Sequence, residues 1–142
     1  MAQVSKKKIA EIIADLDLCM LTTESSRGAL VSRPMSNNGQ VEFDGDSYFF
    51  TYAKSRLVQD IKKNPQVNLS FASSRLLKKI YISVAGVAEI SKDKAEMLEH
   101  WDKELNIWFK KGVQTPGITM IRVRAKRIKY WYGNKEGEYA AK

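Results

Sequence analysis

The chain has 142 residues, 44% of them apolar, and its 24 lysines and arginines against 16 acidic residues give a net charge of +8. These values are typical of a globular domain and exclude a disordered chain, while the basic balance suits nucleic acid, an anionic membrane surface or an anionic small ligand. No apolar run approaches the ~20 residues that span a bilayer, and no apolar signal core follows the basic N-terminus, so the expected location is cytoplasmic.

The first half of the chain predicts short elements separated by turn residues. The predicted elements are a helix over 4–16, strands over 18–23, 29–35, 41–43 and 47–52, and a second helix over 56–63. Ile9, Ile12 and Ile13 lie at helical spacing, which favours an amphipathic first helix. Asp44-Gly45-Asp46 predicts a hairpin turn between the third and fourth strands, and Asn64-Pro65 ends the second helix.

The second half predicts longer strands around one helical segment. The predicted elements are strands over 67–71, 79–90 and 118–130 and a helix over 92–109. Gly86 inside a strand indicates a β-bulge or a close backbone approach. The apolar alternation of the last strand slips at Arg127-Ile128, which predicts a bulge or bend there.

These elements favour one fold class. Six or so strands with few helices predict a mainly β (α+β) antiparallel barrel or sandwich, and no linker divides residues 1–142, so a single domain is expected. The helix over 56–63 is short for a parallel crossover.

The single cysteine, Cys19, excludes an internal disulfide and is expected to be a buried thiol. With only one histidine, His100, no histidine- or cysteine-based metal cluster is expected, and this histidine is expected at the surface.

The turn between the strand 47–52 and the following helix carries the clearest chemistry. Thr51, Lys54, Ser55 and Arg56 gather there, and Ser55 is placed to cap the helix. A helix N-terminus beside hydroxyl groups and cations binds anions, phosphate above all. Arg33 reaches the same anion if its strand neighbours the strand 47–52. The alternative is a capped helix with solvated cations.

Several motifs occur in an order typical of one superfamily. They are Ser32-Arg33-Pro34-Met35, Tyr48-Phe49-Phe50-Thr51, Ser55-Arg56, Asn64-Pro65-Gln66-Val67-Asn68-Leu69, Tyr81-Ile82-Ser83-Val84-Ala85-Gly86-Val87-Ala88, Trp108-Phe109-Lys110-Lys111-Gly112 and Tyr130-Trp131. From about residue 5 to residue 133, the chain resembles the pyridoxamine 5′-phosphate oxidase-like FMN-binding split barrels, and within them the general stress protein subgroup.

The resemblance implies a six-stranded antiparallel split β-barrel with a few short flanking helices, which forms a homodimer with FMN between the subunits. The matching positions imply that the cofactor-binding residues are Arg33, Pro34, Met35, Phe50, Thr51, Ser55, Arg56 and Trp108. Of these, Arg33, Thr51, Ser55 and Arg56 would hold the phosphate and ribityl end. Backbone around Met35 and Phe50 would lie along the flavin ring, with Trp108 coming from the partner chain. FAD or a deazaflavin shares the same phosphate-bearing end.

The family usually has lysine at the position of Arg56, and arginine keeps the charge with a different geometry. The segment 124–127 and the lysine-rich tail do not reproduce the arginine-containing substrate motif of the classical oxidases. A flavin-dependent oxidoreductase of unknown substrate and a non-catalytic flavin carrier or stress protein therefore both remain interpretations. No catalytic residue and no resident metal are assigned.

Two other features have alternative interpretations. Trp101, Trp108 and Phe109 form an aromatic group that suits core or dimer packing, or flavin stacking. The last strand carries a basic row followed by aromatic residues, namely Arg122, Arg124, Lys126, Arg127 and Lys129, then Tyr130, Trp131 and Tyr132. This pattern is typical of a solvated sheet face, and it also fits a barrel that binds single-stranded nucleic acid.

Overall fold

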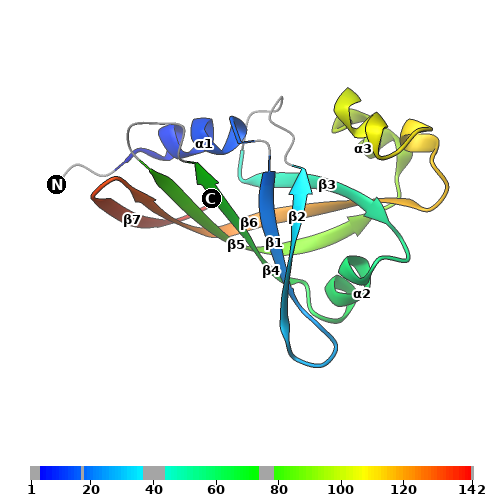
Figure 1. Cartoon of the computed structure of the whole chain (residues 1–142), viewed down its shortest axis with the longest axis horizontal. Coiled ribbons are helices and arrows are strands. Elements are labelled where there is room, and N and C mark those ends of the chain that lie inside the picture. The colour runs from blue at the N-terminus through cyan, green and yellow to red at the C-terminus, as the bar shows by residue number, and fades with distance from the viewer. Residues whose placement is uncertain (1–3, 17, 37–43, 74–78, 142) are drawn as a thin grey trace.

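A computed structural model describes residues 4–16, 18–36, 44–73 and 79–141 (Figure 1). Its elements, in chain order, are α1 (Lys6–Ala14), β1 (Leu18–Glu24), β2 (Leu30–Ser36), β3 (Asp46–Tyr52), α2 (Arg56–Lys63), β4 (Gln66–Ser73), β5 (Ile80–Ser91), α3 (Lys94–Glu99), the 3₁₀ helices η1 (Lys103–Ile107) and η2 (Gly112–Gln114), β6 (Ile118–Tyr132) and β7 (Lys135–Ala140). Most predicted elements are confirmed to within a few residues. The strand expected over 41–43 lies outside the described residues.

The described strands form one antiparallel sheet that curves around the core. Its order is β2-β1-β4-β5-β6-β3, and β7 pairs with β6 beside this path. The sheet has seven strands where six were expected. The additional strand, β7, was missed because Lys135–Ala140 contains little apolar sequence beyond Tyr139. Gly133, at a φ of 62°, supplies the tight turn that pairs it with β6.

A β-bulge interrupts the pairing of the two longest strands. The register of β5 and β6 shifts between Ala85 and Gly86, so that Lys126 is the extra residue on β6. A Cβ atom on Gly86 would lie 2.5 Å from the backbone oxygen of Arg124, and only glycine fits there. The bulge expected at Gly86 is confirmed, and the slip expected at Arg127-Ile128 occurs at the adjacent Lys126.

The helix expected over 92–109 is wrong in its extent. The α-helix α3 ends at Glu99, and the separate η1 begins after Asp102, whose side chain accepts a hydrogen bond from the amide of Glu104. An aspartate that binds nearby backbone in this way favours a new helix start over continuation. As a result Leu98 is exposed, although Met97 beside it is fully buried.

Two apolar clusters fill the molecule. The larger one lies between α1, α2 and the sheet and includes Cys19, whose burial raises its pKa to about 12. The smaller one lies under α3 and the 3₁₀ helices and includes Phe50. The N-terminal segment is tied to the far end of the sheet, because the amide of Val4 donates to the hydroxyl of the buried Tyr130 at 3.0 Å.

Candidate anion site at the start of α2

The short turn from β3 into α2 forms a capped helix N-terminus. Ser55 has extended backbone angles, and its Oγ accepts a hydrogen bond from the amide of Val58 at 3.2 Å. The amide of Ser55 is held by the carbonyl of Tyr52. The amides of Arg56 and Leu57, in the first turn, have no partner within the helix, and that turn contains no acidic residue. The expected N-cap is therefore confirmed, and its surroundings favour an anion.

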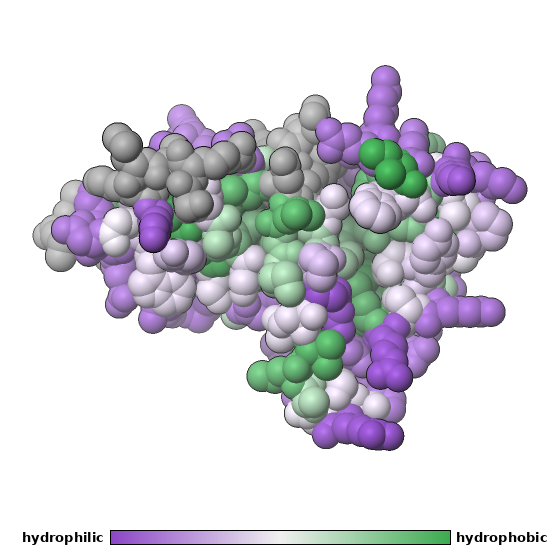
Figure 2. All heavy atoms as spheres, viewed as in Figure 1, coloured by the Kyte–Doolittle hydropathy of each residue, from purple (hydrophilic) through white to green (hydrophobic). Residues whose placement is uncertain are grey.

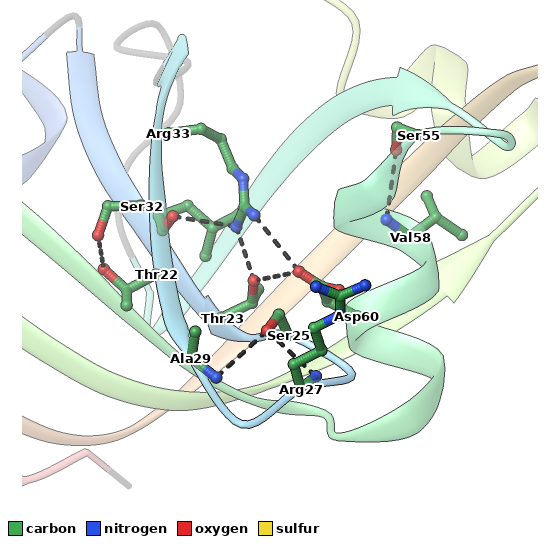
Figure 3. A network of polar contacts seen from close by, with 11 residues as sticks. Thr22, Thr23, Ser25, Arg27, Ala29, Ser32, Arg33, Ser55, Val58 and Asp60 are labelled. Atoms are coloured by element: carbon green, nitrogen blue, oxygen red, sulfur yellow. Dashed lines mark hydrogen bonds and ion pairs between the residues drawn. The ribbon is translucent and has the colours of Figure 1, made fainter.

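The helix α2 is fixed to β1 by a buried polar network (Figure 3). The hydroxyl of Thr23 donates to Asp60 Oδ2 at 2.9 Å and accepts from Arg33 Nη1 at 2.8 Å. The same Nη1 donates to the carbonyl of Leu21, and Arg33 Nη2 lies 3.5 Å from Asp60 Oδ2. Because a buried carboxylate is costly without partners, Thr23 and Arg33 together explain why Asp60 is tolerated on this helix.

Sequence reasoning missed Asp60. It lies on the buried side of α2 with Leu57 and Ile61, and only 8% of it is exposed. The signal that would have found Asp60 is its spacing: it comes three residues after Leu57 and directly before Ile61, on the apolar side of the helix. Such a position requires a cation or a donor opposite it. Arg33 supplies that cation from β2.

A pocket of ≈ 370 Å³ opens beside this network. Its lining residues come from the β1–β2 turn, β2 and α2, and they are Ser25, Ser26, Arg27, Val31, Arg33, Arg56, Gln59 and Asp60. The structure thus brings two of the sequence-predicted residues, Arg33 and Arg56, to one cavity. The expectation that the strand of Arg33 neighbours the strand 47–52 is wrong. The strands β2 and β3 occupy opposite ends of the sheet order, and the packing of α2 against β1 joins the two arginines instead.

The other sequence-predicted residues do not line this pocket. Thr51 is half-buried on β3, opposite Thr119 of β6. Met35 packs against the larger core, and Pro34 is exposed on the edge strand β2. The two aromatic residues of the expected set differ in burial, because Phe50 is buried in the smaller cluster and Trp108 is 69% exposed.

An aromatic group covers the end of the sheet near α3. The Trp101 ring lies edge-on to Phe50 at 4.9 Å and to Phe109 at 5.9 Å, so these residues pack together as expected, while Trp108 does not join the core. His100 is half-buried rather than a surface residue, because its ring stacks on Tyr48 at 3.5 Å. Burial also raises the pKa of Tyr48.

The basic row of the last strand is largely neutralised. Three of its cations pair with carboxylates: Arg122 with Asp46, Arg124 with Glu89 and Arg127 with Glu138. Lys129 lies over the ring of Trp131, and Tyr130 is buried in the core rather than presented for stacking. This face therefore resembles a solvated sheet more than the cationic groove of a nucleic-acid-binding barrel.

The described residues offer neither a cluster of metal ligands nor a membrane-spanning helix. No three histidine, cysteine, aspartate or glutamate side chains within 4–16, 18–36, 44–73 and 79–141 lie close enough together to hold a metal ion. In the same part of the chain, every helix is too short or too polar to cross a bilayer.

Residues 4–141 match the family described as pyridoxamine 5′-phosphate oxidase like. The chain belongs to this family. The antiparallel split barrel implied by the sequence motifs is therefore the fold of this protein, with β7 as an additional strand.

Three known proteins are similar to this chain in sequence or in fold. Protein bli-3 of Neurospora crassa is 28% identical over an alignment of 124 residues that covers 82% of this chain and 58% of that protein, so the chain spans little more than half of this curated relative. A structure related to general stress protein 26, of the pyridoxinephosphate oxidase family, from Clostridium acetobutylicum has a TM-score of 0.78 at 21% identity, covering 92% of this chain and 89% of the other. A heme binding protein from Mycobacterium smegmatis has a TM-score of 0.77 at 15% identity, covering 99% and 60%. At these identities the structural likeness shows the fold alone.

Proposed function

We propose that this protein is a homodimeric FMN-binding protein of the oxidase-like family that holds the flavin phosphate at the start of α2. The observation that carries the proposal is the meeting of Arg33 and Arg56 in one pocket beside the N-terminus capped by Ser55. The residues there are donors and cations, which is the chemistry that a phosphate group requires.

Several side chains at this site have N–H or O–H hydrogens left to donate to a phosphate. In the contacts of the described residues, Arg33 uses three of its five N–H donors on Leu21, Thr23 and Asp60, which leaves its Nε and one Nη2 hydrogen. The Ser55 hydroxyl accepts from an amide and keeps its own hydrogen to donate. Arg56 has a guanidinium group at the pocket wall, and a guanidinium binds phosphate oxygens in pairs.

The ring end of the cofactor is proposed along β2 and β3. Backbone near Met35 and Phe50 would follow the ring, and Thr51 would contact the ribityl chain. Trp108 would come from the partner subunit, which accords with its 69% exposure in the single chain.

Exposed apolar side chains support a second copy of the chain as the partner. Leu30 and Val31 on β2 and Ile107 and Trp108 near α3 are large and exposed. Figure 2 shows apolar side chains at the surface over the β1–β2 hairpin and beside α3. Patches of this kind mark association surfaces more often than bare solvent faces.

When bound, FMN supplies hydride or electron transfer at its N5 atom. The chain itself binds and orients the flavin, and no side chain of the described part is assigned as a proton donor. Turnover of a small substrate and simple flavin carriage are both consistent with this arrangement. FAD and deazaflavins would use the same anion pocket.

Flavin titration tests the proposal. The purified protein is titrated with FMN, FAD and a deazaflavin, each followed by its visible absorbance, and its mass is measured by sedimentation. We expect saturable FMN binding to a dimer, and we expect Arg56→Gln to weaken it at least tenfold. Arg124→Gln removes the same charge from the ion-paired face and serves as the control. Equal FMN affinity in the two variants would reject the proposed phosphate site.

A further inference from the structure

The turn between β1 and β2 presents a third arginine to the anion pocket. Ser25 organises this turn, because its Oγ accepts from the amides of Arg27 and Ala29 and its backbone bonds to Gly28 and Ala29. Gly28 takes a φ of 80°, a conformation that glycine adopts without strain. The Arg27 backbone is therefore held in place, and Figure 3 shows its side chain rising from the turn toward α2.

The arginines divide into two groups by their partners. The described part of the chain contains Arg27, Arg33, Arg56, Arg122, Arg124 and Arg127. Four of these pair with carboxylates of described residues, and the two that do not are Arg27 and Arg56. Both of these line the same pocket. Two arginines that lack a carboxylate partner of their own repel each other in a shared cavity, and an anionic ligand between them would relieve this repulsion.

The charge of the pocket lining specifies that ligand further. The lining contains three arginines and one carboxylate, Asp60, which pairs with Arg33. Two positive charges are left over, those of Arg27 and Arg56. A phosphate monoester carries close to two negative charges at pH 7, with a second pKa of about 6. Without Arg27, the surplus would match only a singly charged ion.

We propose that Arg27 is a phosphate ligand and that it makes the pocket specific for the doubly ionised form of a phosphate monoester. The inference rests on the proposed function, because FMN carries such a group and riboflavin does not. Arg27 thus acts with Arg33 and Arg56 in distinguishing the phosphorylated flavin from the unphosphorylated one. None of the motifs of the chain includes Arg27, which lies between the strands predicted over 18–23 and 29–35.

The test compares Arg27→Gln with wild type, using FMN and riboflavin as probes. Glutamine keeps a polar side chain at this exposed turn, and Arg124→Gln again provides a control of equal net charge. We expect Arg27→Gln to weaken FMN binding at least tenfold and to leave riboflavin affinity unchanged. Equal weakening of both flavins, or an unchanged FMN affinity, would overturn the assignment.

A pH series adds a readout that a merely structural role would not move. The charged groups of the lining are Arg27, Arg33, Arg56 and Asp60, and no histidine lies among them. Between pH 5 and 7.5 the phosphate of FMN gains its second charge. The measured quantity is the ratio of the FMN affinity to the riboflavin affinity. In the wild-type protein this ratio should rise across the range, and in Arg27→Gln it should rise less. Parallel profiles in both proteins would contradict the proposal.

Failure of the flavin proposal is distinguishable from failure of this one. If the wild-type protein binds neither flavin, inorganic phosphate is the remaining probe. Its binding is measured as a rise in the unfolding temperature. A phosphate-dependent rise that is present in wild type and in Arg124→Gln but lost in Arg27→Gln supports Arg27 as a phosphate ligand for some other monoester. An equal rise in all three proteins, or none in wild type, overturns it.

Discussion

The hydroxyl of Thr23 donates to Asp60 Oδ2 at 2.9 Å and joins β1 to α2. Because the same hydroxyl accepts from Arg33, it positions both the helix and one wall of the anion pocket. Thr23 is 1% exposed, so water cannot replace either bond. This one side chain links the stability of the fold to the geometry of the candidate site.

Replacing Thr23 by valine should therefore affect both properties. The substitution leaves two buried or half-buried charged groups short of a partner, which costs about 1–3 kcal/mol in the free energy of unfolding. Urea unfolding measures this cost, and FMN titration should show weaker binding because Arg33 is less well fixed. Thr22→Val is the control, since the hydroxyl of Thr22 bonds at the surface to the hydroxyl of Ser32 and not to the Arg33–Asp60 network. A loss no larger than that of the control would contradict the role given to Thr23.

The bulge at Gly86 should not tolerate a methyl group. In Gly86→Ala the new Cβ would meet the Arg124 carbonyl at 2.5 Å, so the strands must separate, at a cost of about 1–3 kcal/mol or more. Gly28→Ala is the comparison variant. Because Gly28 has a positive φ and open space around it, this substitution introduces backbone strain without a steric contact. Its cost should be the smaller of the two, about 1 kcal/mol. Denaturant unfolding that ranks the variants in the reverse order would refute the close approach.

Cys19 should make stability depend on alkaline pH. Its pKa is raised by burial from 9.0 to about 12, so the folded chain keeps the proton where the unfolded chain releases it. Its contribution is complete below pH 9 and is lost as pH rises from 9 toward 12, by about 1.4 kcal/mol per unit at most. Comparison with Cys19→Ala isolates this slope from the lysines and tyrosines. Thiol labelling at pH 8 should also require unfolding. Rapid labelling of the native protein would contradict its burial.

Trp108 and Trp101 should respond differently to truncation. Trp108→Ala should leave the free energy of unfolding of the subunit within about 0.5 kcal/mol, because the side chain is 69% exposed. It should weaken dimer formation and FMN binding, measured by sedimentation and titration. Trp101→Ala should instead cost about 3 kcal/mol, because its ring packs on Phe50 and Phe109. If Trp108→Ala changes neither association nor flavin affinity, the partner-subunit role is lost.

Local patterns predicted most of the fold. The spacing of Ile9, Ile12 and Ile13, the cap at Ser55 and the glycine at position 86 each specify a backbone feature through nearby residues alone. The errors arose where an element depends on contacts outside its own apolar pattern. The strand β7 is held by pairing with β6 rather than by its own apolar content, and the helix expected over 92–109 ends early because Asp102 caps a second helix.

The candidate site was predictable only in part. Ser55 and Arg56 follow from the strand-to-helix turn, and Arg33 from the motif Ser32-Arg33-Pro34-Met35. Their meeting depends on the packing of α2 on β1, which is a long-range contact that no local pattern encodes. The pocket residues Arg27 and Gln59 lie on a turn and on an exposed helix face. Many polar residues are accepted at such positions, so their presence in the sequence does not indicate a site.

The bond between Val4 and Tyr130 has a consequence for how the protein is made. The two residues are 126 positions apart, and the face of α1 that carries Ile9 and Ile13 is covered by sheet strands. During translation, α1 leaves the ribosome long before the hairpin of β6 and β7 exists to receive the N-terminal segment. Closure of this end of the barrel therefore has to wait until β6 and β7 are made, and until then the apolar face of α1 has no sheet to cover it.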